Sequence, residues 1–257
     1  MTARSGFRWP NGQRCAVSLT YDDALPVHHE NVAPQLASKG LSATFYLCAN
    51  RSFTDNPAVW SRVAALGHEL GNHSLFHPCR REPEDRFAWL APHYDLRHYT
   101  RQRWTDEMRV ANCLLRMLDG QSERTFGNTC DNTTIGQGEH EMPLDDLISA
   151  LFVAARGPCN GLTVVPDSLR YTALGNVAGD AKKALDLQRH IERARDEGGW
   201  IILTFHGVGA DTHKLNIDSA QHAKLVEFLA EQAGEIWTAS MAKVASYLRL
   251  QGYTSRI

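Results

Sequence analysis

The chain has 257 residues, of which 43% are hydrophobic and 22% charged, and its formal net charge is −2 at pH 7. This composition is typical of a globular protein with a hydrophobic core, and it supplies no excess of cations for nucleic-acid phosphates. The first 15 residues contain no hydrophobic signal segment, and the longest apolar run, 147–155, is far shorter than the roughly 20 residues of a membrane helix. We therefore expect one cytoplasmic domain over residues 1–257 with neither nucleic acid nor membrane as partner. No pattern indicates an oligomeric state.

The first part of the chain alternates between strand-like and helix-like segments. β-Branched and aromatic residues predict the strands, hydrophobic residues at helical spacing predict the helices, and Gly40 and Gly67 stand where helices end. The expected strands are 15–21 (CAVSLTY) and 43–48 (ATFYLC), and the expected helices are 28–39 and 57–65. This β-α-β-α order favours a parallel sheet with crossover helices.

The rest of the chain continues the alternation after one irregular segment. Residues 79–103 are polar and aromatic, which is typical either of a solvated surface loop or of an insertion over an active-site mouth. Further on we expect an amphipathic helix capped by Thr105 (105–118), strands at 124–127, 151–155, 200–205 and 235–239, and helices at 181–197, 219–233 and 240–250. The repeated order predicts one barrel-like α/β domain with a core over about 15–250.

The six cysteines, at positions 15, 48, 79, 113, 130 and 159, form no Cys-x-x-Cys pair. In a large domain without a secretion signal, the expected state is reduced and mostly buried thiols.

Chemically active side chains stand at or just after the ends of three predicted strands. They are Asp22 and Asp23, His73 and His77, and His206. Parallel strands bring their carboxyl ends to one rim, where active sites of β/α barrels are built. Taken singly, either aspartate could cap the next segment, and His206 could be a core histidine bonded to a backbone carbonyl.

The histidine pair indicates a metal site. His73 and His77 are four residues apart, so that in a helical turn their rings would share one face. Two histidines and one carboxylate leave positions open for water and substrate, which is the pattern of catalytic rather than structural zinc. Asp23 is the natural third ligand.

Together these segments resemble the polysaccharide deacetylase family, also called the NodB-homology or carbohydrate esterase family 4 (CE4) domain. The resemblance extends over roughly 15–250 in order and spacing. The matching segments are 20–24 (TYDDA), 43–47 (ATFYL), 67–78 (GHELGNHSLFHP) and 203–206 (LTFH).

The resemblance implies a distorted (β/α)7 barrel and metal-dependent hydrolysis of an N-acetyl or related amide. Carried over by position, Asp22 is the base, Asp23, His73 and His77 hold a divalent ion, expected to be Zn2+, and His206 is the acid. Such an ion polarises the carbonyl and acidifies a bound water, Asp22 takes the water's proton, and His206 protonates the departing nitrogen.

Two of the family's motifs are altered. Ala24 replaces a usual glycine, and residues 126–132 (FGNTCDN) lack the arginine that orients the base and the proline of the third motif, although Cys130 resembles a cysteine variant. The fourth motif, an aspartate followed by tryptophan, is not recognisable, and Asp180 and Asp186 are candidates for its aspartate.

We therefore expect a hydrolase of carbon–nitrogen bonds that removes an acyl group from an amino sugar or polysaccharide. A small-molecule substrate is equally compatible with the motifs. One alternative is hydrolysis of a small cyclic or linear amide, as in allantoinase-like relatives, and another is a carbohydrate-binding relative that has lost turnover. Trp89, Tyr94, Tyr99 and Trp104 could stack on sugars, or they could fill a surface groove of the core.

Overall fold

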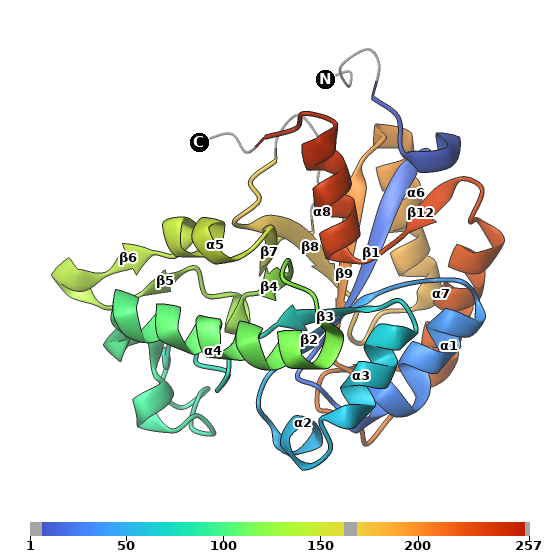
Figure 1. Cartoon of the computed structure of the whole chain (residues 1–257). Helices are drawn as coiled ribbons and strands as arrows, with labels where there is room; N and C mark the ends of the chain where they lie inside the picture. Colours follow the sequence, from blue (N-terminus) through green and yellow to red (C-terminus); the bar gives the residue numbers. More distant parts are fainter. Residues whose placement is uncertain (1–6, 162–168, 255–257) are drawn as a thin grey trace.

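Seven parallel strands close into a barrel, and the helices pack around its outside (Figure 1). The computed structural model describes residues 7–161 and 169–254. The sheet has the order β12-β1-β2-β3-β4-β7-β8-β9 and closes through pairing of β1 with β9. Its strands are β1 Cys15–Asp22, β2 Thr44–Leu47, β3 Glu69–Asn72, β4 Thr125–Gly127, β7 Ala154–Cys159, β8 Leu174–Ala178, β9 Trp200–Phe205 and β12 Ile236–Thr238.

β1 is the strand through which the barrel closes. Along one edge it pairs with β9 from Ala16 to Tyr21. Along its other edge it pairs first with β12, and then with β2 from Thr20 onward. β12 is thus an eighth strand beside a seven-stranded barrel, and the predicted (β/α)7 fold is confirmed.

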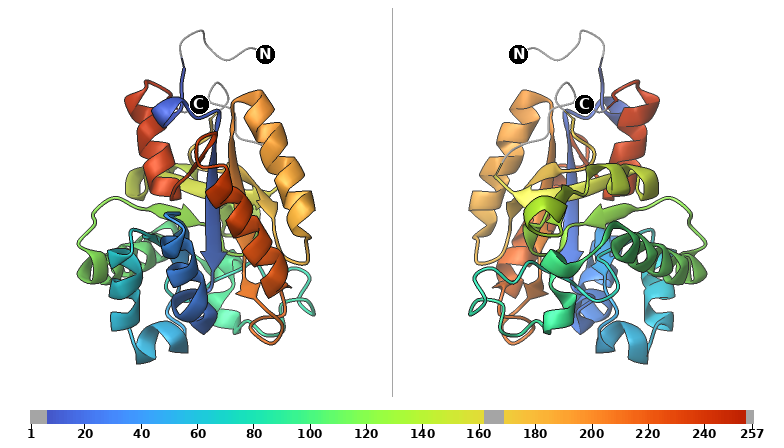
Figure 2. Two further views of the ribbon diagram at one scale, coloured as in Figure 1. Left: turned by 90° about the vertical axis from the view of Figure 1, so that its right-hand side faces the viewer. Right: turned by 90° about the vertical axis from the view of Figure 1, so that its left-hand side faces the viewer.

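The helices lie outside the strands, as two further views show (Figure 2). The longer helices cover the barrel with the buried stripe of an amphipathic helix, whereas the short α2 buries only Phe53. They are α1 Ala33–Ser38, α2 Arg51–Asp55, α3 Ala58–Ala65, α4 Arg101–Asp119, α5 Asp145–Leu151, α6 Ala184–Glu197, α7 Ser219–Glu231 and α8 Met241–Leu250. Two small pairings extend the loops, β5 (Thr134–Ile135) with β6 (Met142–Pro143) and β10 (Gly207–Val208) with β11 (Asn216–Ile217).

The observed burial agrees with the prediction for the segments whose hydrophobic pattern was clearest. All six residues of β9 are buried, as expected for a strand covered on both faces. In α6 the stripe Leu187, Ile191 and Ala194 is buried, and the helix ends at Gly198, whose φ of 67° is the left-handed conformation of a glycine cap.

Several predicted boundaries are wrong for local reasons. Helix α4 begins a turn earlier than expected, because Thr100 and not Thr105 accepts the capping hydrogen bond, from the N–H of Arg103. The segment 28–39 starts as a π-helical turn before α1. The strand expected at 151–155 is β7, which begins at Ala154, because α5 occupies the first part of that apolar run.

The prediction that all six thiols are reduced is also wrong. Cys79 and Cys130 form a disulfide across 51 residues. Cys15 and Cys48 are buried free thiols, and Cys113 and Cys159 are exposed. The pairing escaped notice because the two cysteines are distant in sequence and meet only when the loops after β3 and β4 lie side by side.

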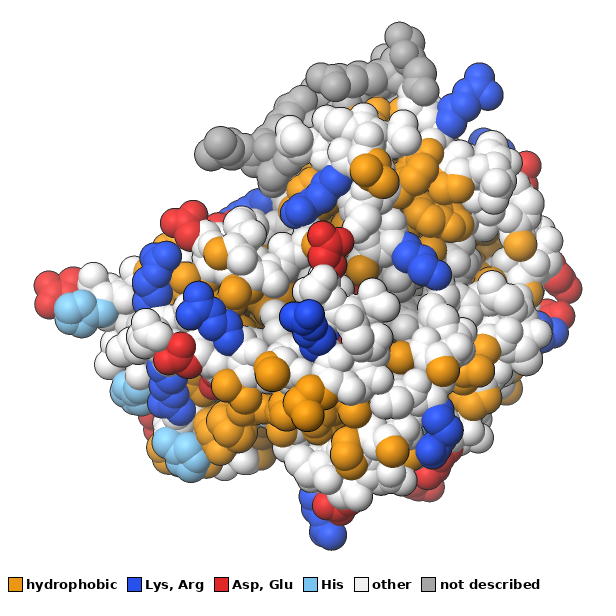
Figure 3. Space-filling view, in the orientation of Figure 1, with side chains coloured by type: hydrophobic (Ala, Val, Ile, Leu, Met, Phe, Trp, Pro, Cys, Tyr) orange, Lys and Arg blue, Asp and Glu red, His pale blue; other side chains and the backbone are white. Residues whose placement is uncertain are grey.

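The surface carries charges of both signs. Side chains of lysine and arginine and side chains of aspartate and glutamate are scattered over the face seen in Figure 3, where hydrophobic side chains gather in several patches. None of the described helices combines the length and the apolar character that crossing a membrane requires.

Candidate active site

The carboxyl ends of the barrel strands bring the predicted site residues together. Asp22 is the last residue of β1, His73 follows β3 directly, and His206 follows β9. Asp23, His73 and His77 form a group that could hold a metal ion, with their ligand atoms all within 4.8 Å of one another.

Asp23 Oδ1 is the centre of this group. It lies 3.4 Å from Nε2 of His73 and 3.2 Å from Nε2 of His77. This oxygen is buried but makes no hydrogen bond to any residue of the described ranges. Ligand atoms bonded at 2.0–2.1 Å to one tetrahedral ion lie about 3.3 Å apart, so the spacing fits a shared zinc-sized cation.

The hydrogen bond on the other side of His73 supports this reading. Nδ1 of His73 bonds the carbonyl oxygen of Gly127 at 2.8 Å and must donate, because a carbonyl only accepts. In neutral His73 the lone pair of Nε2 therefore faces Asp23 Oδ1, an arrangement that a cation stabilises. Gly127 is required here, because a Cβ at this position would lie 3.1 Å from His73 Nδ1 and 2.9 Å from the ring of Tyr46.

The turn after β1 aims Asp23 at the histidines. Asp23 and Ala24 both have positive φ, 76° and 50°. The side-chain amide of Asn50 donates to the carbonyl oxygen of Asp23 and holds this turn. Ala24 thus occupies a left-handed conformation that a glycine adopts at lower cost, by about 1 kcal/mol. Neither aspartate caps the next helical segments, whose N-caps are Val27 and Val32.

The histidine segment is a loop and not the helical turn that the spacing suggested. Ser74 and His77 have φ of 63° and 51°. The hydroxyl oxygen of Ser74 accepts from the N–H of His77 at 2.9 Å. Glu107 of α4 accepts from the N–H groups of Leu75 and Phe76 at 3.3 and 3.2 Å. Glu107 was not singled out in the sequence, because only the fold brings α4 against this loop.

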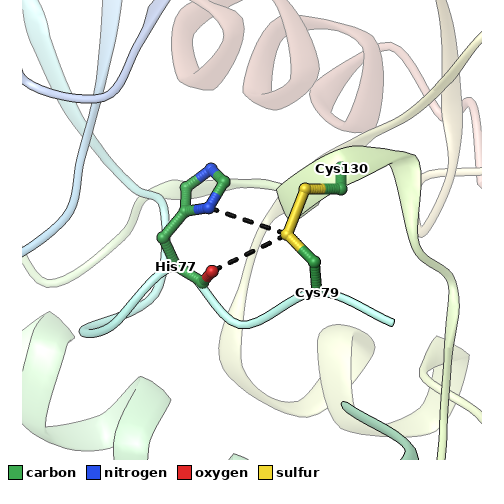
Figure 4. Close-up of side chains that lie close together, drawn as sticks. All are labelled: His77, Cys79 and Cys130. Carbon is green, nitrogen blue, oxygen red and sulfur yellow. Dashed lines mark hydrogen bonds between the residues drawn. A yellow bond between two sulfur atoms is a disulfide. The ribbon is translucent and has the colours of Figure 1, made fainter. Parts of the chain in front are cut away.

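The disulfide touches one of the histidines. Sγ of Cys79 lies 3.7 Å from Nδ1 of His77 and 3.7 Å from its carbonyl oxygen (Figure 4). Cys130 belongs to the loop after β4 whose sequence was compared with the third motif. The disulfide therefore ties the loop that carries His77 to the loop that begins beside His73.

Arg156 of β7 supplies the charge that seemed to be missing beside Asp22. Its guanidinium donates to both carboxylate oxygens of Asp22, with Nη1–Oδ1 at 2.8 Å, and to the hydroxyl of Thr20 at 2.7 Å. Both charged side chains are almost fully buried, with 3% and 4% exposed. The sequence signal that could have revealed it is a charged residue inside an apolar strand.

This ion pair keeps Asp22 ionised. Burial alone would raise the pKa of Asp22, but the Arg156 guanidinium, aided by His73 and His206, holds it below its usual value. Burial also opposes the charge of Asp23, and there His73 and His77 hold the pKa well below the usual value. Both carboxylates are therefore negative at neutral pH.

His206 is paired with Asp180 and is not a core histidine. Asp180 accepts from Nδ1 of His206 at 2.7 Å and from its backbone N–H at 3.0 Å. Burial lowers the pKa of His206, but the bond to Asp180 and the charges of Asp22 and Asp23 raise it overall to about 9. Asp186, the other candidate, lies in the first turn of α6, where it pairs with Arg189.

A second histidine fixes the backbone of His206. His28 accepts from the N–H of Leu25 through Nδ1 at 3.2 Å, so its Nε2 carries the hydrogen and donates to the carbonyl oxygen of His206 at 2.8 Å. Burial lowers the pKa of His28 to about 4. His28 is the neutral, buried histidine bonded to a carbonyl that was one alternative for His206.

The four aromatic candidates divide into two groups. Tyr99 and Trp104 are buried, at 3% and 1% exposed, and belong to the core under α4. Trp89 is exposed, and its ring centroid lies 5.8 Å from that of His77. Tyr94 is partly buried and stacks on Phe76.

Residues 7–128 match the family model described as polysaccharide deacetylase. The resemblance to the polysaccharide deacetylase family is confirmed. A 76-residue stretch, 28% of the chain, is 36% identical to a chitooligosaccharide deacetylase of Sinorhizobium fredii (strain NBRC 101917 / NGR234) and spans 35% of it. A 163-residue stretch, 63% of the chain, is 25% identical to a gellan lyase of a Bacillus species and spans 6% of that protein. The chain thus spans far less than two thirds of these curated relatives.

Solved polysaccharide deacetylase structures share the fold over nearly the whole chain. A Mycobacterium smegmatis protein assigned to this family covers 100% of this chain and 97% of its own, with a TM-score of 0.64 and 15% identity. The Bacillus subtilis peptidoglycan deacetylase PdaC covers 95% of each chain, with a TM-score of 0.56 and 15% identity. A mutant of BA3943, described as a CE4 family pseudoenzyme, covers 93% of this chain and 70% of its own, with a TM-score of 0.52 and 14% identity.

Proposed function

We propose that this polysaccharide deacetylase homologue hydrolyses an N-acetyl or related acyl amide on an amino sugar, releasing acetate and a free amine. The observation that carries the proposal is the joint placement at one end of the barrel of a carboxylate paired with an arginine, a histidine paired with an aspartate, and a group of potential metal ligands. In that order they would serve as the base, the acid and the cation site that hydrolysis of an unactivated amide needs.

Asp23, His73 and His77 would hold the divalent ion, for which we propose Zn2+. Two features fit a cation: Asp23 Oδ1 is buried without a hydrogen bond to any described residue, and the bond from Nδ1 of His73 to Gly127 leaves Nε2 facing this oxygen. When bound, such an ion supplies Lewis acidity, which polarises a carbonyl oxygen and lowers the pKa of a water ligand.

Asp22 would serve as the general base. It is ionised, and both of its oxygens are oriented by Arg156. Because this arginine stabilises the carboxylate anion and lowers the pKa of Asp22, Asp22 is a weak base that suits an acidified water rather than a free one.

His206 would serve as the general acid. An amine leaves poorly as an anion, so cleavage of the carbon–nitrogen bond requires a proton on the departing nitrogen. The pKa of about 9 keeps the ring protonated at neutral pH. With Nδ1 bonded to Asp180, the Nε2 hydrogen is the one available for donation.

The altered third motif was the reason to consider a non-catalytic relative. Arg156 weakens that alternative, because the charge and the hydrogen bonds beside Asp22 come from β7. The chain's match to a chitooligosaccharide deacetylase supports an N-acetylated glycan as substrate class.

The test is metal content together with acetate release, in the wild type and in His73→Ala. We expect about one divalent ion per chain, lost in the variant, and acetate release from N-acetylated glycans that depends on the ion. Metal binding without acetate release from any glycan would contradict the deacetylase proposal and favour small cyclic or linear amides. Protein that never binds a divalent ion would contradict the ligand assignment itself.

A further inference from the structure

The ring of His77 lies between two groups of potential metal ligands. Its Nε2 is 3.2 Å from Oδ1 of Asp23, whereas its Nδ1 is 3.7 Å from Sγ of Cys79 (Figure 4). A second set of three ligand atoms, all within 4.8 Å of one another, comes from His77, Cys79 and Cys130. One imidazole therefore faces a group of nitrogen and oxygen ligands on one side and a pair of sulfur atoms on the other.

The two cysteines can bind a cation only as thiolates, which requires that their disulfide be opened. Cys130 is exposed and Cys79 is completely buried, so Cys130 is the one that a reductant can reach. A dithiol that attacks the sulfur of Cys130 forms a mixed disulfide and expels the thiolate of Cys79. The second thiol of the reductant then releases Cys130 and closes the reductant into its own disulfide. Two electrons and two protons thus pass to the protein, which is left with two thiols.

Hydrogen bonds beside each cysteine join the two loops independently of the disulfide. The hydroxyl of Thr129 donates to the carbonyl oxygen of Pro78. The N–H of Arg80 donates to Oδ1 of Asn132 at 2.9 Å. These bonds connect the close neighbours of one cysteine with the close neighbours of the other, so we expect the two thiols to stay together after reduction.

The spacing of the three ligand atoms fits one tetrahedral cation. Around such an ion, two thiolate sulfurs lie about 3.8 Å apart, and a sulfur and an imidazole nitrogen lie about 3.6 Å apart. The Sγ–Nδ1 distance of 3.7 Å between Cys79 and His77 agrees with the second value. Because a sulfur–sulfur bond is shorter than the first value, the sulfurs need only separate after reduction. Two sulfurs and one nitrogen favour a soft or borderline ion such as Cd2+ or Zn2+.

We propose that the reduced cysteine pair and Nδ1 of His77 form a thiolate cation site, which withdraws this histidine from the group around Asp23. A neutral imidazole has one nitrogen lone pair, so His77 binds a cation through Nε2 or through Nδ1 but not through both. Each thiol releases one proton to water as it binds the ion. The thiolate site stands independently of the proposed function, whereas the loss of activity that it would cause rests on that function.

The test uses Co2+ as the probe, because thiolate ligands give this ion a charge-transfer absorption band that nitrogen and oxygen ligands do not give. Metal-free wild type is reduced with a dithiol, freed of the dithiol without air, and titrated with Co2+ beside the oxidised protein. Thiol titration of unfolded samples should find six thiols in the first and four in the second. We expect the band to saturate at one equivalent of Co2+ in the reduced protein and to be absent from the oxidised protein. Protein that is reoxidised before Co2+ is added should again lack the band.

Variants assign the band to the two cysteines. Cys79→Ser/Cys130→Ser under reducing conditions should show no band, whereas Cys113→Ser/Cys159→Ser, which lacks the two exposed free thiols, should keep it. Reduced His77→Ala should bind Co2+ at least about tenfold more weakly, because one ligand is lost. The comparison of reduced and oxidised wild type holds even where a variant fails to fold.

Acetate release from an N-acetylated sugar separates this inference from the proposed function. With one equivalent of Zn2+, the reduced protein should release acetate at least about tenfold more slowly than the oxidised protein. A disulfide that the dithiol does not open in the folded protein, or six thiols without the band, would overturn the thiolate site and leave the deacetylase function untouched. Equal rates in both states, together with the band, would refute the competition for His77. The band without acetate release in either state would keep the thiolate site and contradict the deacetylase function.

Discussion

The carboxylate of Asp180 holds the imidazole of His206 through Nδ1 at 2.7 Å and also binds the backbone N–H of His206. One side chain thus fixes both the orientation of the ring and its charge. Burial lowers the pKa of His206, but Asp180 and the two site aspartates bring it to about 9. The protonation of His206, and with it the proposed catalysis, therefore depends on Asp180.

Asp180→Asn should lower the pKa of His206, because the amide keeps the shape of the carboxylate but removes its charge. Because the protonated ring is the proposed proton donor, the alkaline limb of the kcat/KM profile should move to lower pH. Asp186→Asn removes the same charge from the exposed start of α6 and serves as the control. Identical pH profiles for the wild type and both variants would rule out the role given to Asp180.

Stability should respond to the same titration. The pKa of His206 is about 9 in the folded state and near 6.5 in the unfolded state. Protonated His206 therefore contributes fully to the free energy of unfolding below about pH 6.5, and this contribution is lost as the pH rises through about 9. The melting temperature of the wild type should therefore fall over this range more than that of Asp180→Asn.

Asp22→Asn should reduce turnover by roughly 10²- to 10⁴-fold, because it removes the proposed general base. Its metal content should stay near that of the wild type, since Asp22 is not placed among the proposed ligands. Measurement of both quantities on the same preparation checks the separation of roles. Full activity in this variant would show that another group takes the proton.

His77→Ala should lose both the expected ion and the activity, because it removes one of the three proposed ligands. His140→Ala, at a ring that is 84% exposed and remote in sequence from the site, is the control for the loss of a histidine. Metal content by elemental analysis distinguishes them. Retention of a full ion in His77→Ala would remove this residue from the ligand set.

Arg156→Met should destabilise the protein by about 3–5 kcal/mol, because it leaves the buried Asp22 carboxylate without its partner. Arg170→Met breaks a pair with Asp145 whose side chains are 59% and 31% exposed, and should cost about 1 kcal/mol or less. Urea denaturation of both variants gives the comparison. Arg156→Lys keeps the charge but not the two parallel hydrogen bonds, so we expect it to fold and to have reduced kcat.

The disulfide makes a prediction about thiol number. Titration of the unreduced, unfolded chain should find four free thiols, and titration after reduction should find six. The double variant Cys79→Ser/Cys130→Ser should lose about 2–4 kcal/mol of stability. Because disulfides persist mainly in oxidising compartments, finding six thiols in protein taken from its own host would show the reduced state that the cytoplasmic prediction requires.

The sequence sufficed to predict the barrel, and the side chains that it singled out at the strand ends do lie together there. The strands with long apolar or β-branched runs, such as β1 and β9, were recognised because burial on both faces leaves a clear pattern. β8 was not recognised, because its sequence LGNVA includes Asn176, a buried polar residue that bonds the hydroxyl of Thr204. Local pattern cannot reveal a polar side chain satisfied by a neighbouring strand.

The residues that support the site were harder to predict. Arg156, Glu107 and the Cys79–Cys130 bond all act across elements that are far apart in sequence. Their partners become neighbours only when the barrel closes, so the spacing of residues along the chain cannot predict these contacts. Asp180 was a candidate only because the resemblance called for an aspartate in that part of the chain.

The position of Arg156 has a consequence for how such barrels diverge. The carboxyl ends of the barrel strands lie on one rim. An arginine on any of several strands can therefore place its guanidinium beside Asp22 in the same arrangement. A lineage can then exchange the donor strand in two steps, gaining the new arginine before losing the old one, without passing through an unpaired carboxylate. Loss of a motif residue in a relative is therefore a reason to inspect the opposite side of the barrel before describing that relative as inactive.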